Sequence, residues 1–241
     1  MMEERDFNRY DFDSGYARGT FTLNQYVVQT FGWMFVGLMI TFLLAAALAL
    51  TGMAYYVFSI PYILSVLLIA ELVVVMVMSA GILKRSVGVT RVLFAAYSVL
   101  NGVVFSVYFA AFNVVNVIFI FGLTAMFFGA FALYGRFTNT DLSRLRPLLV
   151  GGLIFLVVAG LLTMFIDLSA LEQIVCMVGI VIFLCFTAYD VQKIKANYEY
   201  FCGDEVMLQK ASIFSALQLY LDFINLFLYL LRFLGRTSRS R

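Results

Sequence analysis

Seven long apolar runs fill almost all of this 241-residue chain after residue 26. A helix needs about 20 mostly apolar residues to cross the roughly 30 Å hydrocarbon core of a bilayer. The runs occupy residues 27–50, 60–83, 92–112, 114–134, 148–166, 174–190 with the turn that follows, and 212–234. Short connections take up the remainder, so no room is left for a soluble domain. The sequence therefore predicts an all-α integral membrane protein with seven transmembrane helices.

The composition supports the bilayer as the solvent and excludes several kinds of chemistry. Hydrophobic residues make up 63% of the chain and charged residues 12%, against roughly 45–50% and 25% in soluble domains. The absence of histidine excludes histidine-based nucleophilic catalysis and histidine-liganded zinc. The three cysteines form no CxxC pair, and no phosphate-binding glycine motif occurs. A net charge of +2 gives no basis for nucleic-acid binding, and we expect no cofactor.

The lysines and arginines predict the orientation of the helices. Twelve of the 16 lie in the amino-terminal segment and in the second, fourth and sixth connections, whereas the first, third and fifth connections have none. By the positive-inside rule, the amino terminus and these even-numbered connections face the cytoplasm. We therefore expect a multi-pass protein of the plasma membrane with a cytoplasmic tail at 1–25, a membrane domain at 26–235 and a basic tail at 236–241.

The seventh run conflicts with this charge pattern and leaves two topologies open. Four arginines lie near its end or beyond it: Arg232, Arg236, Arg239 and Arg241. Either the run is re-entrant and returns to the cytoplasm, or it crosses the membrane against its own charges. A central helix that is shielded by six others can cross in this way, and this is the topology we expect.

Three carboxylates lie inside the predicted spans: Glu71 in the second, Asp190 at the end of the sixth and Asp222 near the centre of the seventh. An aspartate at the centre of a membrane helix costs roughly 2.5–3.5 kcal/mol, so each is a candidate functional residue. Structural roles stay open, because Glu71 can be protonated or hydrogen-bonded and Asp190 can reach the interface beside Lys193.

A polar stripe runs along the seventh span. Its members are spaced by 3, 4, 3, 4 and 3 residues, which keeps them on one helix face: Ser215, Gln218, Asp222, Asn225, Tyr229 and Arg232. Such a stripe cannot face lipid, so the helix is predicted to be central, with the stripe toward partner helices or a water-filled path. Hydrogen bonding between helices is the simpler explanation, but six polar residues in register fit a pathway or gate better.

Smaller polar faces occur on two other spans. The third carries Ser98, Asn101 and Tyr108 on one face with Tyr97 beside them, and the sixth carries Thr187 and Asp190. Together with the stripe, these faces are expected to line one polar cleft that opens toward the cytoplasm.

Four segments resemble the transmembrane Bax-inhibitor-motif family. TAYDVQKI at 187–194 and SALQLYLDFINLFLYLLRFLG at 215–235 are similar to its signature pair, with further similarity in QTFGWMFVGLMIT at 29–41 and YSVLNGVVFS at 97–106. The chain resembles the bacterial members, which include a partner of the membrane protease FtsH. This resemblance implies a fold in which six helices surround a central seventh.

The resemblance also implies a function and its residues. Family members are viewed as pH-sensitive calcium leak channels whose sensor is an aspartate pair on the sixth and seventh helices, and these positions match Asp190 and Asp222. Glu71 matches an acidic residue on the family's second helix. In a bacterial relative an arginine at the end of that helix latches the pair. Its position is Ile82 here, which leaves Lys84 and Arg85 as the candidate latch residues.

A carboxyl pair of this kind can act as a gate. Two carboxyls within hydrogen-bond distance in a low-dielectric site cannot both ionise cheaply, so they share a proton. The shared proton ties the two helices together, and its loss at higher pH replaces the bond by repulsion. Carboxylates are also ligands for Ca²⁺, so Asp190 and Asp222 are candidate calcium ligands. Supporting positions on an ion path are Glu71, Asn101, Ser215, Gln218, Asn225 and Arg232.

Two other functions remain open. A regulatory protein would bind a membrane protease or another helix bundle without conducting ions. An intramembrane aspartyl protease would use the two aspartates as acid and base, but Leu219, Tyr220 and Leu221 precede Asp222 where a GxGD motif is expected, and no Pro-Ala-Leu element follows.

Overall fold

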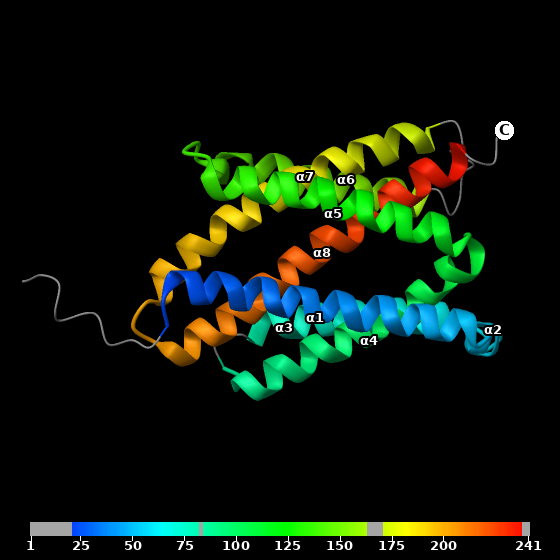
Figure 1. Ribbon diagram of the computed structural model, residues 1–241, viewed down its shortest axis with the longest axis horizontal. Coiled ribbons are helices and arrows are strands. Elements are labelled where there is room, and N and C mark those ends of the chain that lie inside the picture. Colours follow the sequence, from blue (N-terminus) through cyan, green and yellow to red (C-terminus); the bar gives the residue numbers. More distant parts are fainter. Residues whose placement is uncertain (1–20, 82–83, 163–170, 238–241) are drawn as a thin grey trace, which may run out of the picture.

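The computed structural model describes residues 21–81, 84–162 and 171–237, and these form an elongated bundle of helices (Figure 1). The elements are α1 (Leu23–Leu50), α2 (Met53–Phe58), α3 (Ile63–Gly81), α4 (Val87–Ala111), α5 (Val114–Phe137), the 3₁₀ helix η1 (Leu142–Leu145), α6 (Arg146–Leu162), α7 (Glu172–Phe201) and α8 (Glu205–Thr237). Within the described residues, seven segments are long and apolar enough to cross a membrane. The predicted fold class is confirmed, with one membrane helix for each apolar run.

Several helices extend past their apolar runs. α1 begins at Leu23 because Thr22 and Gln25 form a capping box, in which each side chain accepts a hydrogen bond from the other residue's backbone N–H at 3.3 and 2.8 Å. At the other end of the sequence α7 continues to Phe201 and α8 already begins at Glu205. A prediction based on apolar length misses these helix ends, because a helix can continue beyond the bilayer with polar residues. Of the predicted tails, residues 1–20 and 238–241 lie outside the described residues.

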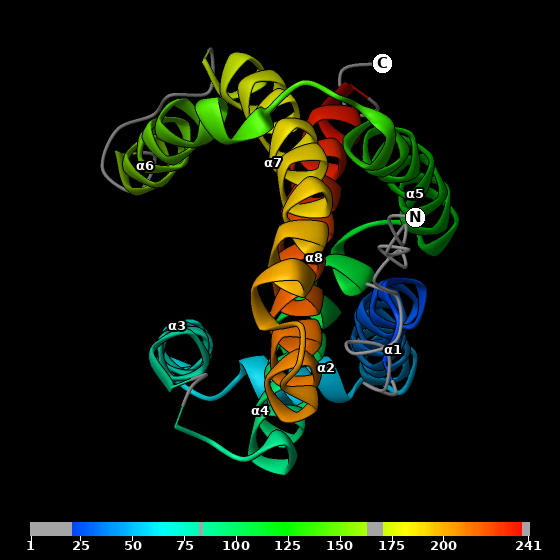
Figure 2. The same ribbon diagram turned by 90° about the vertical axis from the view of Figure 1, so that its left-hand side faces the viewer.

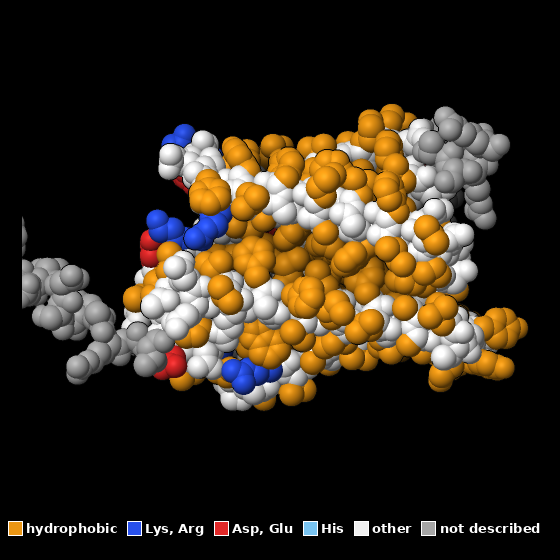
Figure 3. Space-filling model, viewed as in Figure 1, with side chains coloured by type: hydrophobic (Ala, Val, Ile, Leu, Met, Phe, Trp, Pro, Cys, Tyr) orange, Lys and Arg blue, Asp and Glu red, His pale blue; other side chains and the backbone are white. Residues whose placement is uncertain are grey.

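Nine of the eleven described lysines and arginines gather at one end of the bundle, which we call the basic end. It comprises the helix ends and connections that carry Lys84, Arg85, Arg91, Arg136, Arg144, Arg146, Lys193, Lys195 and Lys210. On the face shown in Figure 3, the lysine and arginine atoms all lie at this end of the molecule. Arg91 donates to Gln209 at 3.3 Å, which links α4 to α8 there. The opposite end carries the short α2, whose Tyr55 and Tyr56 are exposed, as in the aromatic belts of membrane proteins.

The connection between α5 and α6 is fixed to α7 at the basic end. The Gln192 side chain donates to the Thr140 carbonyl at 2.8 Å and accepts from the Leu142 backbone N–H at 2.9 Å. In the same connection Asp141 caps η1, and hydrogen bonds from the hydroxyl and backbone N–H of Ser143 hold the pKa of its carboxyl below the ordinary value. The loop is therefore held in one conformation against α7.

α8 lies in the middle of the bundle. In its most apolar stretch 67% of the residues are buried, against 11% for α3. α8 packs against α7, α1, α5 and α4, while α3 packs mainly on α4 and α6 on α7. Viewed from the basic end, α7 and α8 run through the centre with α1 and α5 on one side and α3 and α6 on the other (Figure 2). The predicted central helix is thus found, with its neighbours arranged in an inner and an outer tier.

α8 also resolves the topology conflict. Its 33 residues span about 50 Å at 1.5 Å per residue, which exceeds the bilayer core. It starts at the basic end and finishes at the opposite end, away from the start of α1 (Figure 1). The seventh segment therefore runs the full length of the bundle, as expected of a helix that crosses the membrane.

Glycines allow the closest helix contacts. A side chain at Gly135 on α5 would collide with the backbone carbonyl of Ala188 on α7, and one at Gly37 on α1 would collide with the Phe94 ring on α4. Small residues at such crossings are typical of membrane proteins, where tight packing replaces the hydrophobic effect as the force that joins helices.

Gly135→Ala is expected to destabilise the protein by about 1–3 kcal/mol, because α5 and α7 must move apart to admit the methyl group. Thermal unfolding of the detergent-solubilised protein measures this. Gly129→Ala on the same helix is the matched control. No atom would lie within 4 Å of its new methyl group, and replacing a helical glycine should be neutral or stabilising by up to about 1 kcal/mol. Equal melting temperatures for the two variants would contradict the packing argument.

The course of α8 predicts that the two termini lie on opposite sides of the membrane. Reporter fusions after residue 203, in the connection between α7 and α8, and after residue 241 should give opposite signals in cells. The same signal at both positions would show that α8 does not cross.

Candidate functional site

The interface between α7 and α8 buries several polar side chains. Three cross-helix pairs follow one another at intervals of seven residues on each helix: Asn197 with Ser215, Asp190 with Asp222, and Phe183 with Tyr229. Seven residues are close to two helical turns, so the two antiparallel helices keep one register over about 20 Å. The predicted polar stripe of α8 therefore faces α7.

Asp190 and Asp222 form the centre of this interface. Their exposed fractions are 8% and 5%, and the two carboxyl groups are within hydrogen-bond reach of each other. Asp190 Oδ1 and Asp222 Oδ2 are buried, and no described residue donates to them. Ionised carboxyls only accept hydrogen bonds, so a proton is required to join the pair. The predicted juxtaposition of the two aspartates is present.

Few other groups act on the pair. Lys193, about one turn further along α7, is the cation that attracts Asp190, and its ammonium lies 5.9 Å from the Tyr189 ring. The Thr187 hydroxyl donates to the Phe183 carbonyl of its own helix at 2.8 Å. The pair is thus held by its own mutual contact, with one basic residue nearby.

The candidate latch residues lie elsewhere. Lys84 is exposed and Arg85 half-buried in the connection between α3 and α4, and neither interacts with Asp190 or Asp222 within the described part of the chain. Ile82 lies outside the described residues. The latch role of Lys84 or Arg85 stays a prediction, and in this structure Lys193 is the cation that acts on Asp190.

The remaining stripe residues have varied surroundings. Ser215 accepts a hydrogen bond from Asn197 Nδ2 at 3.1 Å. Asn225 donates to the Leu221 carbonyl of its own helix at 2.8 Å, and Gln218 is half-buried. Arg232, near the end opposite the basic end, interacts with Tyr108 of α4. The stripe thus joins α8 mainly to α7.

A second polar cluster lies on the other side of α8. Tyr220 donates to the Thr41 hydroxyl at 2.6 Å, since Thr41 uses its own proton to donate to the Ser98 carbonyl at 2.9 Å. The Asn101 side chain donates to the Tyr97 backbone carbonyl at 3.4 Å. We call Thr41, Ser98, Tyr97, Asn101 and Tyr220 the tyrosine cluster.

Glu71 belongs with the tyrosine cluster. It is half-buried on α3, interacts electrostatically with Tyr97 and Tyr220, and keeps its Oε1 atom buried without a hydrogen-bond partner among the described residues. Residues two apart on a helix point in directions about 200° apart, so Tyr220 and Asp222 face opposite ways. At this level the central helix therefore separates Glu71 and Asn101 from the aspartate pair, and the two polar groups form separate clusters.

Aromatic rings fill the core between the aspartate pair and the end opposite the basic end. The rings come from α1, α4, α5 and α8 and have centroid separations of 4.4–6.1 Å: Phe42, Phe105, Phe109, Phe121, Phe128, Phe223 and Phe227. Such edge-to-face and stacked contacts stabilise each other beyond area burial. We call this group the aromatic cluster.

Sequence reasoning missed three of these participants. Thr41 and Tyr220 were not singled out because a lone threonine or tyrosine in an apolar run carries little signal. Asn197 lies beyond the predicted end of the sixth span, although its spacing of seven from Asp190 places it on the same face. The aromatic cluster had no sequence signal, since phenylalanines are distributed over all the spans involved.

Resident metal binding finds little support. Within the described residues, no group of three or more aspartate, glutamate or cysteine side chains is close enough to hold a metal. Calcium takes 6–8 oxygen ligands, and Asp190 and Asp222 would supply only part of that shell.

Comparisons with known proteins extend over the whole bundle. The sequence model of the family described as "Inhibitor of apoptosis-promoting Bax1" matches residues 23–239. The chain is 41% identical over 215 residues to inner membrane protein YbhL of Escherichia coli K12, covering 88% of this chain and 92% of YbhL. An uncharacterized protein of Borreliella burgdorferi is 35% identical, with 88% and 92% covered, and one of Chlamydia muridarum is 32% identical, with 95% and 99% covered.

A double-mutant cycle on Thr41→Val and Tyr220→Phe should give a coupling free energy of about 0.6–1.7 kcal/mol, the range for hydrogen bonds between membrane helices. Unfolding of the purified protein in mixed micelles measures it. The control cycle combines Thr30→Val with Tyr220→Phe. Thr30 is also buried on α1, but its hydroxyl donates to a carbonyl of its own helix at 2.9 Å. Coupling of the same size in the control would refute a specific bond between α1 and α8.

Proposed function

Because this chain belongs to the Bax inhibitor family of multi-pass membrane proteins, we propose that it is a pH-sensitive calcium leak channel gated by Asp190 and Asp222. The observation that carries the proposal is the contact between two buried carboxyls on adjacent helices. Burial without other donors makes this contact depend on one proton. A change of pH can therefore act directly on the packing of α7 against α8.

The gate closes when the proton is shared. In that state the carboxyl–carboxyl hydrogen bond holds α8 to α7 midway along their interface. Loss of the proton leaves two negative charges in a site of low dielectric constant, where their repulsion is strong. The helices then separate at this level, and water and cations enter between them. Closure is thus favoured at low pH and opening at high pH.

The aromatic cluster supports the view that the described conformation is closed. Its rings join α8 to α1, α4 and α5 beyond the aspartate level. The phenyl rings themselves offer an ion no oxygen ligands to replace its hydration shell. Conduction therefore requires α8 to move relative to them as well as to α7.

The polar atoms near the basic end favour ion entry from that side. Asn197 and Ser215 lie about two turns from the aspartates toward the basic end, with Gln218 between. The concentration of lysine and arginine at that end supports a cytoplasmic location for it, and hence a cytoplasmic amino terminus. Calcium is the proposed permeant ion, with the carboxylates as transient oxygen ligands in the open state.

Calcium flux into liposomes that contain the purified protein tests the gate. Flux should rise with pH by up to about tenfold per pH unit, the limit for an equilibrium linked to one proton. Asp222→Asn and Asp190→Asn should each flatten this dependence, because the remaining carboxyl can hydrogen-bond to the amide without a shared proton. Glu199→Gln is the control, since Glu199 is an exposed carboxylate on α7, the helix that carries Asp190.

Each variant is first checked for a wild-type melting profile, and the two aspartate variants serve as independent tests. An unchanged pH dependence in both folded variants would refute the gate. Wild-type protein that passes no calcium at any pH would instead favour the regulatory role, with a membrane protease or another helix bundle as the partner. Cleavage of a transmembrane peptide that is lost in Asp222→Asn would favour the protease alternative.

A further inference from the structure

A cavity of about 560 Å³ opens at the basic end between α1, α5 and α7, and neither Asp190 nor Asp222 lines it. This volume is within the range of roughly 300–1,000 Å³ that is usual for small-molecule sites. Its walls are mostly apolar and come from Leu23, Val27 and Phe31 of α1, Leu133 and Phe137 of α5, and Val191 and Ile194 of α7. Gly129 adds room, because a side chain there would meet no atom within 4 Å.

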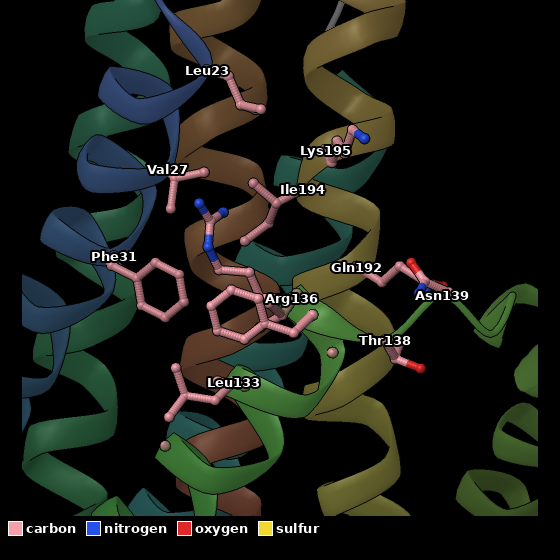
Figure 4. Close-up of a pocket in the computed structure, with 15 residues that line it drawn as sticks. Leu23, Val27, Phe31, Leu133, Arg136, Thr138, Asn139, Gln192, Ile194 and Lys195 are labelled. Carbon is pink, nitrogen blue, oxygen red and sulfur yellow. The ribbon is translucent and has the colours of Figure 1, made fainter.

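The polar groups of the cavity are cationic or neutral. Its 15 lining residues include Arg136 and Lys195 and no carboxylate. Figure 4 shows the Arg136 side chain extending between Val27 and Phe31 on one side and Ile194 on the other, while Lys195 lies further along α7 at the rim. No described carboxylate is within ion-pair distance of Arg136, whereas Lys195 has an exposed contact of 3.8 Å with Glu199. Among the described residues, the cavity therefore offers a guanidinium without a carboxylate partner, beside apolar walls.

We propose that this cavity binds an anionic phospholipid, with the phosphate at Arg136 and an acyl chain along Val27, Phe31 and Leu133. A ligand with an anionic head and an apolar chain satisfies both the cation and the walls. The site also lies where the helices reach the membrane surface, and basic pockets between helices at that level suit anionic headgroups. A soluble anion would leave the apolar walls exposed. The alternative occupant is the amino-terminal segment, residues 1–20, which has five carboxylates and three arginines. In a membrane it would have to compete with lipid for the cavity.

The test measures the melting temperature of the full-length protein in detergent as a function of added phosphatidylglycerol. Phosphatidylcholine with the same acyl chains is the matched neutral lipid. A ligand that binds only the folded state raises the melting temperature as its concentration rises, so the curve gives an apparent affinity. We expect stabilisation by phosphatidylglycerol at concentrations where phosphatidylcholine has little effect.

Two kinds of variant test the proposed contacts. Arg136→Gln should weaken the apparent affinity about fivefold and the double variant with Lys195→Gln about 30-fold, from the usual contribution of each cation near an anionic headgroup. Gly129→Leu should also weaken binding, because it fills the cavity without changing a charge. Arg144→Gln is the control, since Arg144 is a basic-end residue outside the cavity.

Three results would overturn the proposal. Equal loss of affinity in Arg144→Gln would mean that phosphatidylglycerol binding depends only on the overall charge of the protein. Equal stabilisation by inorganic phosphate would mean a soluble anion rather than a lipid. Binding that appears only after residues 1–20 are deleted would show that this segment occupies the cavity.

Discussion

The burial of two carboxyl groups between α7 and α8 is the constraint from which much of this architecture follows. Asp190 and Asp222 lie at a depth where charges are costly, so both must be turned away from lipid and toward each other. This requires α8 to be surrounded on several sides, and four helices pack directly against it. The remaining two membrane helices, α3 and α6, lie in the outer tier and are correspondingly more exposed.

The two faces of α8 carry different kinds of polar group. Toward α1 and α4, Tyr220 and Thr41 form a short chain of hydrogen bonds in which each donor has an acceptor. Toward α7, the aspartates have oxygens without donors among the described residues. A satisfied network stabilises one arrangement, whereas an incompletely satisfied one changes with protonation. The central helix thus carries a satisfied polar network on one side and, on the other, carboxyl oxygens without donors among the described residues.

Much of this arrangement was predictable from the sequence because membrane constraints are strict. Apolar length gave the seven crossings, and the spacing of the polar stripe from Ser215 to Arg232 correctly required a partner helix. The 3.6-residue period places residues on a face but does not say which neighbouring helix that face meets. For this reason Glu71 and Asn101 were grouped with Asp190, although α8 stands between them. The capping box at Thr22 and the extension of α7 beyond Asp190 depend on local hydrogen bonds and on water outside the bilayer, which apolar length does not report.

The matched spacing along α7 and α8 restricts how these helices can move. Sliding one past the other by a single turn would bring Asp190 opposite Gln218 or Leu226, and Asn197 would lose Ser215 in the same step. All three cross-helix pairs would break together, without a new set of partners to replace them. A change of tilt or a sideways displacement can instead break the aspartate contact first and leave the pairs above and below it in place. Motion of α8 is therefore expected to be angular rather than piston-like, with the ends of the interface serving as pivots.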